Sequence, residues 1–123
     1  MLYAMFCYDS EAEVGAWTKD QDASAMTNLG AVQDKLAKAG KLGPVVRLMP
    51  TTTATTLRKG RDAVVLDGPF AETKEQLLGF FVVDCATLDE AVETARELAS
   101  CYSSSGCYEI RPVGFFNPGV SVG

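Results

Sequence analysis

The first residues of the chain form an unbroken apolar run that meets Asp9, and this run predicts a strand over Met1–Tyr8. Successive side chains of a strand point to opposite faces of the sheet. Both faces of this strand are apolar, with Leu2, Ala4, Phe6 and Tyr8 on one and Tyr3, Met5 and Cys7 on the other. Helices on one side of a sheet leave its second face in water, so a second apolar face predicts a partner there. We therefore expect a homodimer.

Further short runs rich in β-branched and aromatic residues predict the remaining strands. The turn Lys59–Asp62 joins two of these runs into a hairpin. The predicted strands are Pro44–Met49, Thr51–Leu57, Ala63–Leu66, Phe80–Cys85 and Cys107–Val113.

Helical spacing of apolar residues predicts two helices. The first is expected over Ala23–Ala39, and the second opens at Thr87, which stands in capping-box spacing with Glu90. The polar stretch Asp9–Asp22 is expected to be a loop with at most one helical turn. The resulting order is β-α-β-β-α-β with one hairpin added, in a single domain over residues 1–113 followed by a tail over 114–123.

In the segment from Asp67 to Gly79, almost every residue has a recognisable local role, such as stopping a strand or capping a helix. Asp67, Gly68 and Pro69 are residues that stop a strand. Thr73 and Gln76 have capping-box spacing, and Gly79 is placed to end a helical turn at the C′ position. We therefore predict one or two helical turns here, with a helix start beside Lys74 that suits an anion.

Composition narrows the class of protein. A chain of 123 residues with 47% apolar residues has room for one domain with a modest core. Its net charge of −5, with eleven scattered basic residues, argues against binding of nucleic acid or of an anionic membrane surface. No signal peptide and no membrane-spanning run are recognised, so we expect a cytoplasmic protein.

The four cysteines have no C-x-x-C spacing, and the chain has no histidine. A zinc site is therefore not expected, and neither is any other metal or cofactor. We expect reduced thiols, with a Cys101–Cys107 disulfide as the minor alternative in an oxidising sample.

The stretch DGPFAETKEQLLGFF resembles the signature of the DGPF, or YCII-related, family of small bacterial proteins. That signature reads D-G-P-F-x-E-x-K-E-x-L-x-G-[FY]. The resemblance extends to residues 53–56 and 109–113. The matching positions are Asp67, Gly68, Pro69, Phe70, Glu72, Lys74, Glu75, Leu77, Gly79 and Phe80.

This resemblance implies a ferredoxin-like α+β subunit, with an antiparallel sheet, two helices on one face, and dimers of the α+β barrel type formed sheet to sheet. It also permits a regulatory role beside an extracytoplasmic-function sigma factor. Some relatives are suspected enzymes with a His–Asp pair, which a chain without histidine lacks.

Candidate ligand-binding residues lie on two predicted strands. Glu109 and Arg111 share one face, and Arg47 on another strand could join them, with Asp67 nearby. Such a cluster suits an anionic ligand, because Arg binds carboxylate or phosphate bidentately. An ordinary salt-bridge network is an equally good interpretation.

Candidate catalytic groups are few, because the general base must be a carboxylate, Lys, Tyr or Cys. Asp67 is the first choice, with Phe70 as the residue that would bury it, although a turn cap explains Asp67 at least as well. Glu72 and Lys74 are secondary candidates, and Asp9 is a weaker one.

Four functions remain open. We favour a dimeric binding or accessory module that takes a small anionic or aromatic acid without catalysis. The alternatives are a lyase or isomerase with Asp67 as general acid or base at the dimer seam, a regulatory partner of a sigma factor, and an oligomeric scaffold without a ligand.

Overall fold

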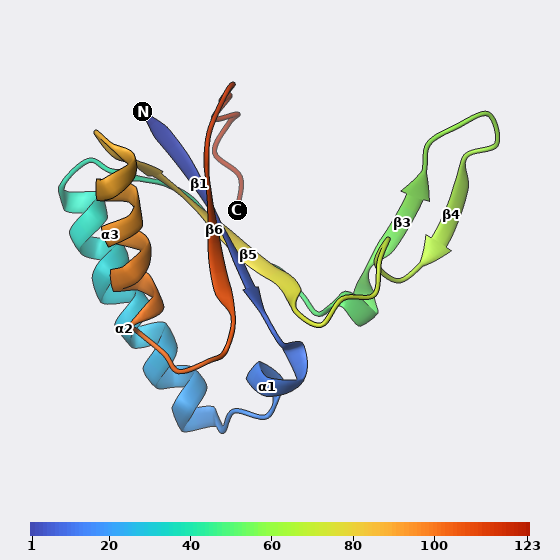
Figure 1. The fold of residues 1–123 in the computed structure, drawn as a ribbon, viewed down its shortest axis with the longest axis horizontal. Coiled ribbons are helices and arrows are strands. Elements are labelled where there is room, and N and C mark those ends of the chain that lie inside the picture. The colour runs from blue at the N-terminus through green and yellow to red at the C-terminus, as the bar shows by residue number, and fades with distance from the viewer.

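A four-stranded antiparallel sheet with helices on one face forms the body of the protein, and a two-stranded hairpin projects from it (Figure 1). The computed structural model describes all residues, Met1–Gly123. Its elements are β1 (Leu2–Asp9), α1 (Glu11–Gly15), α2 (Lys19–Lys38), β2 (Leu42–Arg47), a 3₁₀ turn (Thr51–Thr53), β3 (Thr55–Arg58), β4 (Val64–Asp67), β5 (Gln76–Asp84), α3 (Leu88–Ala99) and β6 (Cys107–Pro112).

The strand order of the sheet is β2-β5-β1-β6, and every neighbouring pair is antiparallel. With β3 and β4 set aside, this is β-α-β-β-α-β connectivity with the first and third strands in the centre, as in a ferredoxin-like α+β fold. The predicted fold class is confirmed, and so is the extra hairpin, in which β3 pairs only with β4.

Helix α2 begins a turn earlier than the predicted Ala23. Thr18 caps its first turn by accepting from the Gln21 amide, and the Gln21 side chain accepts from the Thr18 amide in return. Reciprocal satisfaction of two free amides fixes the helix start at Lys19. The predicted loop before it holds the short helix α1, which is capped by Ser10.

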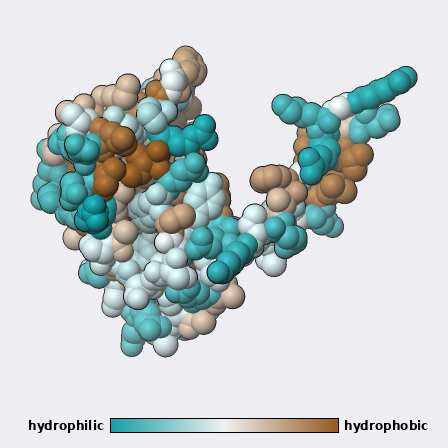
Figure 2. Space-filling model, in the orientation of Figure 1, coloured by the Kyte–Doolittle hydropathy of each residue, from teal (hydrophilic) through white to brown (hydrophobic).

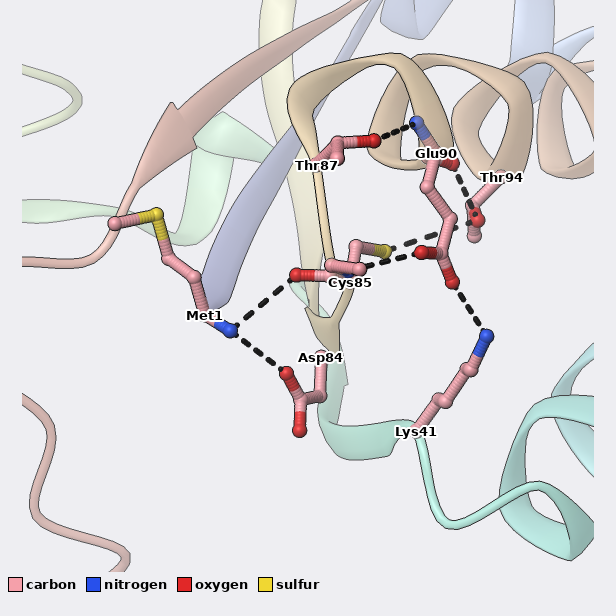
Figure 3. A network of polar contacts seen from close by, with 8 residues as sticks. Met1, Lys41, Asp84, Cys85, Thr87, Glu90 and Thr94 are labelled. Carbon is pink, nitrogen blue, oxygen red and sulfur yellow. Dashed lines mark hydrogen bonds and ion pairs between the residues drawn. The ribbon is translucent and has the colours of Figure 1, made fainter.

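Helix α3 begins at its predicted cap. The Thr87 oxygen accepts from the Glu90 amide, while the Glu90 carboxylate accepts from the Ala86 amide and pairs with Lys41 (Figure 3). The N-terminal ammonium bonds Asp84 in the same network. These contacts tie the end of β5 to the start of the chain, and α3 to the turn between α2 and β2.

The core lies between the sheet and the helices α2 and α3 (Figure 1). Tyr3 and Met5 point into it, which makes Tyr3, Met5 and Cys7 the helix-facing side of β1. The residues of the core cluster are Tyr3, Met5, Leu36, Phe81, Val83, Cys85, Ala91, Ala95 and Leu98.

The second face of the sheet, which we call the open face, is covered by no helix (Figure 1). Val82 on this face is nevertheless buried, while Leu2, Ala4, Phe6 and Phe80 are half-buried. The Phe6 and Phe80 rings lie 6.4 Å apart. The open face is therefore apolar but only partly exposed in the single chain.

The predicted helix over 73–78 is wrong. Gln76 already belongs to β5, where it pairs with Asp9 of β1. Thr73 and Gln76 do bond each other, but through Gln76 Nε2 to the Thr73 carbonyl, and Gln76 Oε1 accepts from the Glu11 amide instead of capping a helix. Strand pairing with β1 outweighs the local capping preference, and the proposed anion-binding helix start beside Lys74 does not exist.

The role predicted for Gly79 is wrong as well. This residue lies inside β5, buried, between Cys7 of β1 and Arg47 of β2, and its φ is not positive. Gly68, in contrast, has φ +96° and ends β4 as predicted.

Candidate functional site

A small apolar cavity lies between the helix-facing side of the sheet and the N-terminal half of α2. Its volume is about 130 Å³, which is close to the ~150 Å³ of an engineered cavity that binds benzene. It is lined by Cys7, Asp9, Val14, Trp17, Asp22, Ala25, Met26, Leu29, Gln33, Val45, Val46, Arg47, Leu78, Gly79, Phe81, Tyr102 and Tyr108.

Aromatic rings form much of the cavity wall. Trp17 meets Tyr102 edge to face with ring centroids 5.7 Å apart, and Phe81 stacks on Tyr108 at 6.3 Å. Trp17 follows α1, Phe81 lies on β5, and Tyr102 and Tyr108 flank the loop before β6. Such walls favour a flat aromatic ligand. Trp17 thus packs against Tyr102 and lines the cavity at the same time.

The hydroxyl groups of Tyr102 and Tyr108 bond each other at 2.7 Å. Burial raises the pKa of Tyr102 to about 12 and also raises the pKa of Tyr108. Burial is likewise the largest cause of the rise in the pKa of Cys7 to about 12. All three groups therefore carry their protons at neutral pH, so the cavity holds hydrogen-bond donors and no thiolate nucleophile.

Asp9 is the buried acid of the cavity. It ends β1 with only 3% of its surface exposed, and its Oδ2 accepts from Ser104 at 2.8 Å. Its Oδ1 is buried and has no hydrogen-bond partner. A buried carboxylate oxygen without a donor is destabilising, so a donor supplied from outside the chain would be favoured here.

Arg47 supplies the positive charge of the cavity from the end of β2. Its Nη2 donates to Asp22 at 3.2 Å and its Nη1 to the Met26 sulfur at 3.3 Å, and just over half of the side chain is exposed. A guanidinium has five N–H donors, so these two contacts leave others free for a ligand.

The predicted cluster of Arg47 with Glu109 and Arg111 is not brought together within one chain. Glu109 and Arg111 pair with Phe6 and Ala4, which places them on the open face, whereas Arg47 contacts α2 on the other face. Strands β2 and β6 are also opposite edges of the sheet, roughly 14 Å apart at three strand spacings. The side chains of Glu109 and Arg111 form no hydrogen bond and no ion pair within the chain.

The signature residues Asp67, Phe70, Glu72 and Lys74 lie outside the cavity. All four are exposed, at the end of β4 and in the segment that returns from it to β5. Phe70 is 76% exposed, so it does not bury Asp67 in the single chain. Among the predicted candidates, the cavity thus contains only Arg47 and the weaker candidate Asp9.

Sequence reasoning missed Asp22, Tyr102 and Tyr108 as cavity residues. Tyr108 shares a face with Cys7, its partner across the β1–β6 ladder, and that pairing could not be read without the strand order. Asp22 lies in the stretch that the polar pattern predicts as a loop, although the Thr18–Gln21 capping box is a readable signal for a helix there.

The family model of the YCII-related domain matches residues 1–117. The chain belongs to the YCII-related family. It is 55% identical over 120 residues to "Uncharacterized protein R00369" of Rhizobium meliloti (strain 1021), and the match covers 97% of each chain.

Two further properties bear on this YCII-related protein. No helix combines the length and the apolar character needed to cross a bilayer. No His, Cys, Asp and Glu residues gather in threes that could hold a metal ion.

Proposed function

We propose that this YCII-related protein is a non-catalytic, homodimeric module that binds a small aromatic acid in the cavity beneath α2. The observation that carries the proposal is an aromatic-walled cavity with a guanidinium, that of Arg47, among its lining groups. Pockets for small molecules are commonly apolar with a few convergent polar groups that fix orientation.

The size of the cavity favours a ligand with one ring. A volume of about 130 Å³ accommodates a benzene-sized group and little more. A single carboxylate on that ring would meet the exposed part of Arg47, which can bind it bidentately. A hydroxyl group on the ring would test whether the ligand donates a hydrogen bond to the unpartnered Oδ1 of Asp9.

The protonation of the cavity favours binding over catalysis. Cys7 and Tyr102 both have a pKa of about 12, so neither acts as a base near neutral pH.

The alternative enzyme with Asp67 as general base depends on a second copy of the chain to enclose that residue, which is exposed here. No surface of the chain singles out a sigma factor as the partner.

Fluorescence of Trp17 tests the proposal directly, because it is the only tryptophan and it lines the cavity. Titration with benzoate or 4-hydroxybenzoate is expected to change its emission in a saturable way and to raise the melting temperature. Benzyl alcohol, which lacks the carboxylate, is expected to bind more weakly.

Arg47→Gln is expected to weaken benzoate binding by about tenfold or more, because a charge-assisted hydrogen bond contributes about 1.5–3 kcal/mol. Arg96→Gln, an exposed arginine of α3 outside the cavity, is the matched control and is expected to leave binding unchanged. Equal loss in both variants, or saturable binding by neither acid in the wild type, would refute the proposal. Unchanged binding and turnover in Asp67→Asn would count against the enzyme alternative.

A further inference from the structure

The hairpin formed by β3 and β4, together with its turn over 59–63, is a projecting element that we call the arm. It stands away from the sheet and helices (Figure 1). Its two strands pair only with each other, and seven of their eight residues are exposed. An isolated two-stranded hairpin is marginally stable at best in water, and three or more strands or a packing partner are needed.

The arm is apolar on both of its faces. Leu57 lies opposite Val65 on one face, and Val64 and Leu66 lie on the other. These four side chains are between 47% and 66% exposed, and apolar colour gathers on the arm in Figure 2. Exposed apolar groups concentrated on one element mark a surface that another molecule covers.

The base of the arm is held in place by one residue of α1. The Glu11 carboxylate accepts from the amide and hydroxyl of Thr51, where the chain leaves the body. The Glu11 amide donates to Gln76 Oε1 at 2.9 Å, where the chain returns. The segments that lead to and from the arm are thus fixed to the body at Thr51 and Gln76, which restricts the directions open to the arm and lowers the entropy lost on docking.

The charge of the arm is opposite to that of the rest of the chain. Its tip carries Arg58, Lys59 and Arg61 against Asp62, whereas the whole chain has sixteen acidic and eleven basic residues. None of the three basic side chains forms an ion pair within the chain. A positively charged apolar arm complements a second copy of this acidic protein.

We propose that the arm docks on a second copy of this chain, against the open face of the sheet beside β6, with two arms exchanged reciprocally. This inference rests on the homodimer of the proposed function and assigns the contact that holds it. The open face offers the half-buried apolar groups Leu2 and Phe6, and the Glu109 side chain, beside Phe6, forms no ion pair within the chain. The basic tip of one arm pairs with Glu109 of the other copy.

Dimer dissociation measured by sedimentation over a dilution series tests the apolar part of this contact. Leu57→Glu/Val65→Glu is expected to raise the dimer dissociation constant about a hundredfold, because it places two charges in a buried contact. The matched control, Leu88→Glu/Val122→Glu, changes two exposed apolar residues outside the arm and is expected to dimerise as the wild type does. Circular dichroism and urea unfolding verify that both variants are folded.

Charge reversal tests the position of the contact. Lys59→Glu/Arg61→Glu and Glu109→Lys are each expected to weaken the dimer, and an equimolar mixture of the two is expected to restore it. In the mixed dimer, a reversed arm tip meets Lys at position 109 and an unchanged tip meets Glu109.

Three results would overturn the inference. A wild type that stays monomeric at every concentration removes the homodimer and the arm contact together. An arm variant that dimerises as tightly as the wild type removes the arm contact alone. Failure of the mixture to dimerise better than either charge variant removes Glu109 as the docking position.

Discussion

Replacement of Gly79 by alanine is expected to destabilise the protein through a clash of backbone atoms. A Cβ atom at this position would lie 2.2 Å from the Val46 carbonyl oxygen and 3.2 Å from the Arg47 Cα. Ordinary contacts of carbon atoms lie near 3.5–4.0 Å, so β2 must move by more than about 1 Å from β5. Backbone atoms of a strand cannot swing aside as the end of a side chain can.

The magnitude follows from the strain and the hydrogen bonds that the shift affects. Overpacking costs about 1–3 kcal/mol, and each ladder bond lost between β2 and β5 about 1 kcal/mol more. The neighbouring bond from the Leu48 amide to the Leu78 carbonyl, 2.8 Å long, is the first at risk. We expect a loss of about 3 kcal/mol in the free energy of unfolding, or about 10 °C in melting temperature.

Gly30→Ala is the matched control, because no atom lies within 4 Å of a Cβ at that position in α2. It is expected to stabilise the protein by about 1 kcal/mol, since alanine favours a helix over glycine. Gly79→Asn separates two explanations for the glycine. A C′ cap with positive φ would accept Asn, whereas the strand position in β5 is expected to reject it as it rejects Ala.

Urea unfolding followed by Trp17 fluorescence, with linear extrapolation to water, measures all three variants. Opposite signs for Gly79→Ala and Gly30→Ala are expected. A Gly79→Ala protein as stable as the wild type, or Gly79→Asn far more stable than Gly79→Ala, would refute the strand-clash reasoning.

Two further predictions concern the core and the cavity. Leu98→Ala is expected to lower the free energy of unfolding by about 2–5 kcal/mol, because Leu98 is fully buried. Leu88→Ala, at the start of α3 where Leu88 is 53% exposed, is the control and should lower it by under about 1 kcal/mol. Urea unfolding of the two variants measures the difference. The Cys7 pKa of about 12 in the folded protein exceeds the ordinary value of 9.0, so the stability that Cys7 contributes is complete below pH 9 and is lost as pH rises toward 12. Between pH 8 and pH 11, Cys7→Ala should therefore lose less stability than the wild type under reducing conditions, and parallel losses would contradict this.

Several features could be predicted from the chain because their causes are local. An unbroken apolar run defines β1, and the Thr87 cap followed by an apolar stripe at helical spacing defines α3. The turn after Arg58 and the stop at Asp67 define the hairpin, for which only neighbouring residues are needed.

The two failures near the signature segment and the charged strands share one physical cause, which is pairing between distant segments. Thr73 and Gln76 carry a valid local cap signal, yet Gln76 is taken by β1 and by the Glu11 amide. The expected cluster of Arg47 with Glu109 failed because the register of the sheet places the two on opposite faces. Neither fact can be read from the residues near these positions.

Local patterns in the chain were enough to identify most of the strands and helices and the apolar character of both faces of the sheet. Packing between distant segments is what brings Trp17, Arg47 and Tyr108 around one cavity and leaves the signature residues near Asp67 away from it. The reason is that local patterns fix the conformation of each segment, whereas the cavity depends on strand order and register, which are set by contacts between residues far apart in the chain.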